Sequence, residues 1–270
     1  MVLLKNDGVL PLPKKGKKIA FIGEFAKSPR YQGGGSANIN SFKVVSALEA
    51  ASDISEIIYA QGYETIEDRK NQELFDEAID IASKADIAVV FVGLPEAFES
   101  EGYDREHMRM PNCQNELISS IAKVQKNTVV ILHNGSPVEM PWADEVSAIL
   151  EAYLGGEGVG TAEVSLLFGD ANPCGKLAES FPLKLSDNPS YLFYHGNGKR
   201  TEYREGVFVG YRYYDSKKMN VRYPFGHGLS YTTFMYDNLQ ISKGEILDNE
   251  ELKISFDVTN TGKMAGKGTV

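Results

Sequence analysis

The sequence predicts an α/β protein whose mostly parallel sheet is sandwiched by helices. Short apolar runs alternate with helical patterns up to about residue 183, which is typical of parallel βαβ units with helices on both sheet faces. Hydrophobic residues make up 42% of the chain and charged residues 24%, as in an ordinary globular protein. After residue 233 the pattern becomes β, which predicts a second, smaller unit that begins a β-sandwich.

The elements of the α/β part follow from these patterns in order along the chain. The first apolar run, Lys18-Ile-Ala-Phe-Ile-Gly23, predicts a buried strand that leads into a glycine-rich loop. Further strands are expected at 56–59, 86–93, 128–133 and 148–153. Helices are expected between them at 41–51, 67–85, 113–125 and 160–168, and the longest of these has an amphipathic pattern.

The chain changes character after Pro182. Residues 184–233 are rich in tyrosine, glycine and proline without a clear period, which indicates a functional loop or a connection between domains. Strand patterns return at 236–241 and 252–260, and because two strands alone are marginal we expect the start of an incomplete β-sandwich. The predicted domains are therefore an α/β sandwich at 1–183, a connection at 184–233 and a truncated β-domain at 234–270.

Composition excludes several classes of protein. The net charge of −9 argues against a nucleic-acid surface, which needs a basic patch, and suits a neutral ligand such as a sugar. No apolar run approaches the roughly 18 residues of a membrane span. Cys113 and Cys174 are too few for a disulfide framework, and such low cysteine use fits the cytoplasm, which we favour, or a bacterial envelope.

Both ends of the sequence interrupt a pattern. Residues 1–11 contain no cleavable apolar region of the kind that a signal peptide needs. The chain stops within the strand-rich part at Lys267-Gly-Thr-Val270. We therefore expect these 270 residues to be part of a longer polypeptide.

Known cofactor and nucleophile motifs are absent. Gln32-Gly-Gly-Gly-Ser36 follows the first strand but lacks the G-x-G-x-x-G order, so a nucleotide-binding flavodoxin-like domain is only a rival interpretation. These glycines more simply let the backbone approach another surface closely, either a ligand or a neighbouring domain. Asn134-Gly-Ser-Pro137 is the nearest candidate for a G-x-S-x-G nucleophile elbow, but its proline argues against this motif. The histidines are scattered, and we expect no metal or other cofactor and a core role for His133.

The acidic run Glu99-Ser-Glu-Gly-Tyr-Asp-Arg105 is the strongest candidate for chemistry. It follows the strand at 86–93, so its carboxylates should lie at the carboxyl end of a parallel sheet, where ligands collect. Three acids and one arginine beside a glycine could tune a proton donor, or they could form a solvated loop.

Two aromatic segments leave their interpretation open. Residues 200–215 interleave aromatic and charged side chains, which suits stacking on sugar faces or, as we favour, a packed connection between domains. Tyr223-Pro-Phe-Gly-His-Gly-Leu-Ser-Tyr231 has two glycines and a proline that fix the path of the chain, as in a structural hinge.

Six of these runs, in this order, make the sequence similar to glycoside hydrolase family 3, in its β-glucosidase branch. They are Leu4-Lys-Asn-Asp-Gly-Val-Leu-Pro-Leu12, Gln32-Gly-Gly-Gly-Ser36, Glu101-Gly-Tyr-Asp-Arg105, Asn134-Gly-Ser-Pro-Val-Glu139, Tyr203-Arg-Glu-Gly-Val-Phe-Val-Gly-Tyr-Arg-Tyr-Tyr214 and Tyr223-Pro-Phe-Gly-His-Gly-Leu-Ser-Tyr231. The resemblance implies a (β/α)8 barrel, then an α/β sandwich, then a fibronectin-III-like domain. This chain would hold the sandwich and the first strands of the fibronectin-III-like β-sandwich, without the barrel.

The resemblance also implies roles for individual residues. In this family the barrel supplies the nucleophilic aspartate and the sandwich supplies the acid/base glutamate of a retaining mechanism. The matching position is Glu101, the acid followed directly by glycine, with Glu99 and Glu106 as competitors that spacing alone does not exclude. Ser36 would contact sugar hydroxyls. Arg105 would anchor the loop, through Asp104, rather than pair with Glu101.

The implied function is that of an exo-acting β-glycosidase, most simply a β-glucosidase that releases the terminal non-reducing sugar of a β-linked oligosaccharide or glucoside. Because the nucleophile would lie outside the chain, residues 1–270 alone should be inactive. A β-xylosidase or α-arabinofuranosidase of the same family is the first alternative. A non-catalytic sugar-binding module is the second, and it requires Glu101 to face away from the barrel interface.

Overall fold

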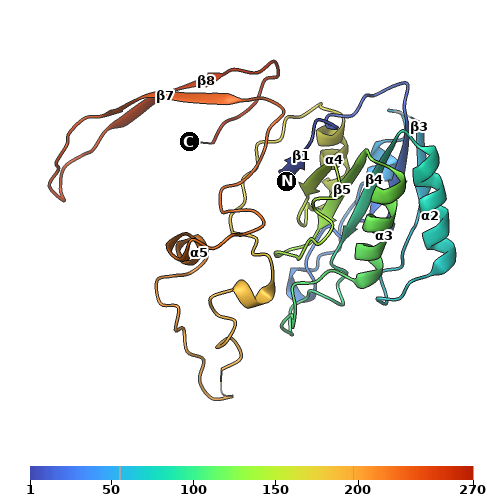
Figure 1. The fold of residues 1–270 in the computed structure, drawn as a ribbon, viewed down its shortest axis with the longest axis horizontal. Coiled ribbons are helices and arrows are strands. Elements are labelled where there is room, and N and C mark those ends of the chain that lie inside the picture. Colours follow the sequence, from blue (N-terminus) through green and yellow to red (C-terminus); the bar gives the residue numbers. More distant parts are fainter. Residues whose placement is uncertain (55, 197, 270) are drawn as a thin grey trace.

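The computed structural model describes residues 1–54, 56–196 and 198–269, and its central feature is a six-stranded sheet (Figure 1). The strand order is β1-β6-β5-β4-β2-β3. The strands are β1 Val2–Asn6, β2 Lys18–Ile22, β3 Glu56–Ala60, β4 Ile87–Gly93, β5 Thr128–His133 and β6 Ala148–Glu151. β2 to β6 are parallel and β1 is antiparallel to β6, which confirms the mostly parallel sheet.

Helices cover both faces of this sheet (Figure 1). On one face α1 Ala47–Ala50 contacts α4 Val159–Leu167, and on the other α2 Gln72–Lys84 contacts α3 Asn112–Val124. Side chains of each strand alternate between the two hydrophobic cores, since Phe91 belongs to the α1/α4 side while Val90 and Val92 belong to the α2/α3 side. β4 and β5 are buried along their whole length, as expected of central strands in a three-layer fold.

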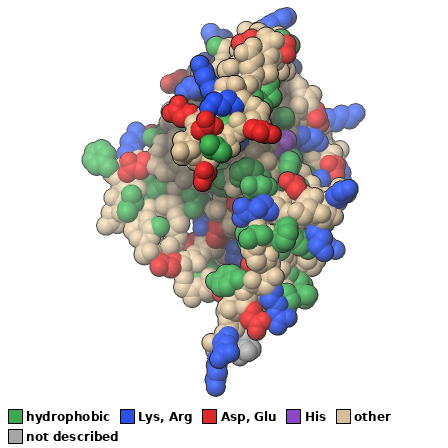
Figure 2. Space-filling model, turned by 90° about the vertical axis from the view of Figure 1, so that its left-hand side faces the viewer, with side chains coloured by type: hydrophobic (Ala, Val, Ile, Leu, Met, Phe, Trp, Pro, Cys, Tyr) green, Lys and Arg blue, Asp and Glu red, His purple; other side chains and the backbone are tan. Residues whose placement is uncertain are grey.

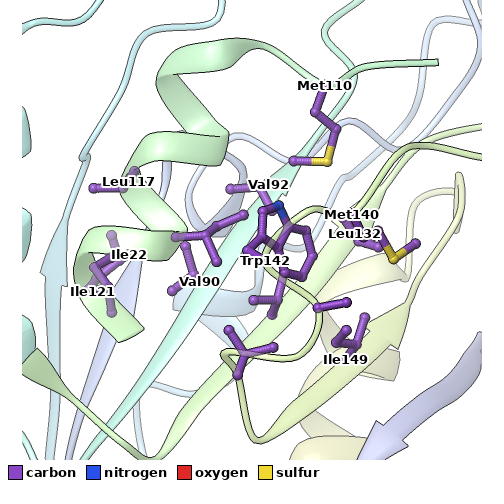
Figure 3. Close-up of a cluster of buried hydrophobic side chains, with 14 of the residues drawn as sticks. Ile22, Val90, Val92, Met110, Leu117, Ile121, Leu132, Met140, Trp142 and Ile149 are labelled. Atoms are coloured by element: carbon purple, nitrogen blue, oxygen red, sulfur yellow. The ribbon is translucent and has the colours of Figure 1, made fainter. Parts of the chain in front are cut away.

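Trp142 lies at the centre of the core on the α2/α3 side (Figure 3). In this close-up Val92 lies beside its ring, and Ile149 of β6 and Leu117 of α3 belong to the same cluster. The indole N–H is not left unpaired, because Trp142 Nε1 donates to Asn115 Oδ1 at 2.8 Å. The only tryptophan of the chain therefore reports on the packing of this core.

The topology places a switch point between β2 and β4. The chain leaves β2 toward β3 on one side and leaves β4 toward β5 on the other, while β2 and β4 are themselves hydrogen-bonded neighbours. Connections that diverge in this way leave a crevice at the carboxyl ends of the two strands, which is where open α/β sheets bind ligands. The loops that follow β2 and β4 are the glycine-rich turn and the acidic run.

Two predicted helices are shorter than expected. Residues 42–45 do not continue α1, because the Val45 N–H donates to Glu157 O and the Val45 carbonyl accepts from Gly160. α1 then begins after Ser46, whose hydroxyl caps it. α2 begins at Gln72 rather than near residue 67, with Asn71 as its capping residue.

Two elements, β1 and α5, were not predicted from the sequence patterns. β1 is a five-residue edge strand whose short apolar run carries no period of its own. α5, Tyr211–Lys217, lies within the segment that lacked a clear period, and it buries only Tyr214. Both are held by neighbouring segments rather than by their own amphipathic pattern, which is why periodicity did not reveal them.

The segment after Pro182 returns to the sheet before it enters the last two strands. Phe181 pairs with Tyr223, and the Leu229 N–H donates to Leu3 O at 2.8 Å. β7 Phe234–Ile241 and β8 Ile254–Asn260 then form an antiparallel pair that extends away from the sandwich (Figure 1). This two-stranded sheet was predicted, whereas its fibronectin-III-like character stays a prediction. Within the described ranges no helix is long and apolar enough to cross a membrane.

Candidate active site

Three loops converge at the carboxyl ends of β2, β4 and β5. The loop after β2 carries Arg30 and the glycine-rich turn, the loop after β4 carries the acidic run, and the loop after β5 contains Gly135 and Ser136. Side-chain hydrogen bonds join all three loops. Segments about 35 and 70 residues apart are thereby assembled into one site beside the switch point.

Glu101 is exposed and points toward the glycine-rich turn rather than into the sandwich interior. Its side chain lies directly against Gly35. Across the described part of the chain, its carboxylate takes part in no hydrogen bond or ion pair. It is thus an exposed carboxylate at the carboxyl end of the parallel sheet, where ligands of such sheets collect.

The glycines of the turn are required by this close approach. A Cβ at Gly35 would overlap the Glu101 side chain, and one at Gly34 would overlap Ser100 Oγ. Gly35 also has φ +75°, a conformation that residues with a Cβ rarely adopt. The predicted close approach of the glycines is therefore correct, but the surface that they approach is the acidic loop of the same sandwich rather than a ligand or a neighbouring domain.

Glu99 is the most strongly bound acid of the run. Its Oε2 accepts from Arg30 Nη1 at 2.7 Å and from Gly135 N at 2.8 Å, and its Oε1 accepts from Ser136 Oγ. We call this group, Arg30, Glu99, Gly135 and Ser136, the Glu99 clamp.

The clamp keeps Glu99 ionised. Burial by itself raises the pKa of the carboxyl, but the hydrogen bonds from Ser136, Gly135 and Arg30 and the charge of Arg30 outweigh burial, so the pKa lies below its usual value. A carboxylate held in this way is a poor proton donor near neutral pH. Of the three acids that spacing left open, Glu99 is thus engaged in structure, whereas Glu101 and Glu106 are exposed.

The predicted anchoring of Arg105 through Asp104 is wrong. Arg105 Nη1 donates to Ser136 Oγ at 2.7 Å and to Pro137 O at 3.2 Å, and it lies 4.0 Å from Glu99 Oε1. Asp104 instead accepts from the Tyr194 hydroxyl at 3.0 Å. Arg105 therefore anchors the acidic loop to the loop after β5. Ser136 supplies the acceptor at this half-buried position, whereas Asp104 is exposed to solvent.

The other predicted site residues lie nearby. Ser36 is exposed on a short 3-10 turn, Gly35–Ala37, next to the Glu101 side chain. Glu106 is also exposed, further along the acidic loop, where it lines the cavity described below. Ser36 is thus the sequence neighbour of Gly35, which contacts Glu101, whereas Glu106 lines the cavity.

Sequence reasoning missed the buried polar groups beneath the loops. Burial raises the pKa of Glu151 to about 8, and the carboxyl accepts from Asn134 Nδ2 and from Tyr153 N, both at 3.0 Å. Asn134 also donates to Ser136 O, so it supports the turn that holds the clamp. An acid within the apolar run 148–153 was the available signal.

His133 is a core histidine, as predicted. Its side chain is fully buried, with Nδ1 3.3 Å from Arg30 O and Nε2 3.0 Å from Glu163 Oε1. Both contacts lie below the loops, so the histidine supports the backbone of Arg30 rather than facing the crevice.

A cavity of about 1040 Å³ opens between the acidic loop and the segment after Pro182. Aromatic residues from both sides line it, among them Tyr103, Tyr194, Tyr211 and Phe225. The face shown in Figure 2 is hollowed near its middle, with apolar and charged side chains around the hollow. Tyr211 stacks on Phe225 at 4.8 Å between ring centroids, so the aromatic segment is packed in part, as favoured, while Tyr203 and Phe208 remain exposed.

A three-layer α/β domain that presents a free carboxylate at its switch point belongs to the class of sheet proteins that bind ligands at the ends of their strands. Residues 1–231 match the model of the glycosyl hydrolase family 3 C-terminal domain. The chain therefore belongs to this family, as the resemblance implied.

Curated relatives match the chain over its whole length. It is 54% identical to thermostable beta-glucosidase B of Acetivibrio thermocellus, with 100% of this chain and 36% of that protein aligned. It is 41% identical to exo-alpha-(1->6)-L-arabinopyranosidase of Bifidobacterium longum, with 100% of this chain and 37% of that protein aligned. The chain thus spans about a third of the length of these relatives.

Solved structures share the fold. A family 3 beta-glucosidase of Bifidobacterium adolescentis superposes with a TM-score of 0.91 at 43% identity, over 97% of this chain and 38% of that one. Beta-glucosidase of Kluyveromyces marxianus, in complex with glucose, superposes with a TM-score of 0.88 at 28% identity, over 98% of this chain and 50% of that one.

Proposed function

We propose that this chain supplies the general acid/base of a retaining, exo-acting β-glycosidase, most simply a β-glucosidase. The proton-transferring group is Glu101, and the nucleophilic carboxylate comes from an N-terminal (β/α)8 barrel of the same polypeptide. The observation that carries the proposal is the free, exposed carboxylate of Glu101 beside Gly35 at the switch point. The names of the curated relatives support the reaction class.

The chemistry assigns two successive tasks to one carboxyl group. In the first step the external carboxylate attacks the anomeric carbon, the glycosidic C–O bond breaks, and protonated Glu101 gives its proton to the leaving oxygen. In the second step ionised Glu101 takes a proton from water, whose oxygen attacks the anomeric carbon and releases the nucleophile.

Ser36 is the proposed substrate contact. Its exposed hydroxyl lies one residue from Gly35, which packs against Glu101, so a sugar oxygen held near the acid would be within reach of the same turn. A hydroxyl can both donate and accept a hydrogen bond, as recognition of sugar hydroxyl groups requires.

The domain organisation is part of the proposal. We infer an α/β sandwich at 1–183, a connection at 184–233 and the first strands of a fibronectin-III-like domain at 234–270. The inference is supported by the six-stranded sheet, by the few regular elements after Pro182 and by the separate β7–β8 pair. The exposed faces of that pair fit an incomplete β-sandwich.

The test is the Glu101→Ala variant of the full-length enzyme. General acid/base groups contribute about 10²–10⁴-fold, so kcat/KM for a phenyl β-glucoside, whose leaving group needs a proton, should fall by this order. A dinitrophenyl β-glucoside, which leaves without help, should lose much less in kcat/KM. Equal, near-normal rates on both substrates would reject Glu101 as the acid/base and favour another acid or a non-catalytic binding module.

A pentosidase is the second candidate, because one relative at 41% identity is named exo-alpha-(1->6)-L-arabinopyranosidase. Such an enzyme would use Glu101 in the same way and differ in the sugar ring that it accepts. A panel of nitrophenyl glycosides on the full-length enzyme, covering glucosides, xylosides and arabinosides, decides between them through kcat/KM. A preference for a pentoside would replace the β-glucosidase assignment and leave the role of Glu101 unchanged.

A further inference from the structure

The residue two positions before the proposed acid/base is held unusually firmly. Arg30 Nη1 donates to the carboxylate of Glu99 and to Leu94 O, both at 2.7 Å, while Arg30 Nη2 donates to the backbone carbonyl of Glu99, also at 2.7 Å. One guanidinium therefore fixes both the side chain and the main chain of Glu99, as well as the start of the same loop. Planar, multiple donation of this kind is specific to arginine.

The clamp is anchored from the opposite side as well. Gly135 N and Ser136 Oγ donate to the Glu99 carboxylate, and Ser136 Oγ in turn accepts from Arg105 Nη1 at 2.7 Å. Arg105 belongs to the acidic loop, so the β5 turn contacts this loop both before and after Glu101. The segment 99–105 is thus tied at both ends while Glu101 projects from its middle.

These contacts are energetically important because the side chains that make them are largely buried. The side chains of Arg30, Glu99 and Arg105 are 7%, 17% and 17% exposed. A charge-assisted pair that is this shielded is costly to break from one side, because the remaining charge stays without a partner. Glu101, by contrast, has an exposed carboxylate free of such bonds within the described residues.

We propose that the Glu99 clamp positions Glu101 for proton transfer, so that Glu99 is a positioning residue for the acid/base. The inference rests on the proposed function and assigns a role to an acid that the reaction itself does not use. The clamp fixes the backbone on one side of Glu101, and the contact with Gly35 limits its side chain on the other. Misplacement of a catalytic group by about 1 Å can cost up to about 100-fold in rate, so loss of the clamp should have a measurable effect on kcat/KM.

The test compares Glu99→Gln, Glu101→Gln and the double variant of the full-length enzyme. Glu99→Gln removes the charge and keeps the shape, so kcat/KM for a phenyl β-glucoside should fall up to about 100-fold, and much less for a dinitrophenyl β-glucoside. Adding Glu99→Gln to Glu101→Gln should have no further effect, because a positioning residue acts only through the group that it positions.

The control is Asp86→Asn, at the opposite end of β4. Asp86 also accepts from a backbone N–H, Lys18 N at 2.9 Å, and from a lysine, Lys17 Nζ at 3.0 Å, and these bonds lower its pKa. The Asp86→Asn variant should leave the ratio of kcat/KM between the phenyl and the dinitrophenyl β-glucoside unchanged. Ser136→Ala removes one bond of the clamp, and a smaller effect of the same kind keeps the test decisive if Glu99→Gln does not fold.

The outcomes separate the two proposals. Normal rates in Glu101→Gln would overturn the proposed function. A slow Glu101→Gln with either an unaffected Glu99→Gln or a full, multiplicative loss in the double variant would overturn the positioning role alone. A loss in Glu99→Gln that is equal for both substrates would do the same, since that pattern indicates general damage to the fold.

Discussion

At the scale of single residues, Gly35 shows how the site depends on the absence of a side chain. Its φ of +75° suits glycine, and the place of a Cβ is taken by the Glu101 side chain. Gly16 has nearly the same backbone angle, φ +76°, and no atom within 4 Å of the place of its Cβ. Comparing substitutions at these two glycines therefore distinguishes the effect of backbone strain from the effect of contact with Glu101.

Gly35→Ala should therefore damage both stability and activity of the full-length enzyme, whereas Gly16→Ala should affect stability alone. Each substitution costs about 1–2 kcal/mol for an L-residue in the left-handed region. Only Gly35→Ala also displaces Glu101, so only this variant should show a large fall in kcat/KM on a phenyl β-glucoside. Equal kinetics in the two variants would show that the contact with Gly35 does not set the position of Glu101.

The site was only partly readable from the sequence, also for reasons at this scale. Glu101 and the glycine-rich turn each follow an apolar run, so their place at the strand ends could be predicted. Arg30 carried no local signal, because its partner Glu99 lies 69 residues away in sequence. The anchoring of Arg105 failed in the same way, since Ser136 comes from another loop.

At the scale of elements, the start of α3 is stabilised by a residue from a distant loop. Pro111 at the N-cap position has no side chain to cap the helix. Asp68 accepts from Asn112 N and Cys113 N instead, both at 2.9 Å. Burial raises the pKa of Asp68, but these hydrogen bonds outweigh it and hold the pKa below its ordinary value.

Asp68→Ala should lower the free energy of unfolding of the 270-residue chain by about 1–2 kcal/mol, as for the loss of a helix cap. Because the folded-state pKa is depressed, the difference from wild type is fully present above the ordinary carboxyl pKa and closes as the pH falls through the lower value. Urea denaturation followed through Trp142 fluorescence measures it. Asp144→Ala, which removes an exposed ion pair with Arg222 at 3.2 Å, serves as the control and should change little.

Elements were predictable where a run of side chains faces one environment. β5 is a continuous apolar strand, and the sequence placed its bounds correctly at 128–133. The segment 41–51 carried a helical pattern, but the N–H groups of Phe42 and Val45 donate to Glu157 in the loop before α4, and such tertiary bonds override propensity. α5 lies in a segment held by contacts with neighbouring segments, so no hydrophobic period predicted it.

At the scale of the whole molecule, apolar surface remains on the parts outside the sandwich. Large side chains are exposed on the β7–β8 pair and on the segment after Pro182, among them Met235, Leu239, Leu192 and Val207. Figure 2 shows apolar groups spread over the face that carries the hollow. Surface of this kind marks interaction sites, which fits a chain that spans about a third of its relatives.

The 270-residue chain by itself should therefore show no turnover of an aryl β-glucoside, because on the proposed function it holds only Glu101 of the two carboxyl groups that a retaining glycosidase requires. It should also self-associate through its exposed apolar surface, which sedimentation velocity detects. The full-length enzyme assayed at equal concentration is the positive control. Robust hydrolysis by the purified chain would mean that both carboxyl groups lie within residues 1–270.

The most direct measurement is azide rescue of the full-length Glu101→Ala enzyme on a dinitrophenyl β-glucoside. With the acid/base removed, the glycosyl-enzyme forms but water attacks it slowly, whereas azide needs no general base. The account predicts that azide raises kcat and that the product is the β-configured glycosyl azide. An enzyme whose rate and hydrolysis product are unchanged by azide would contradict the assignment of Glu101.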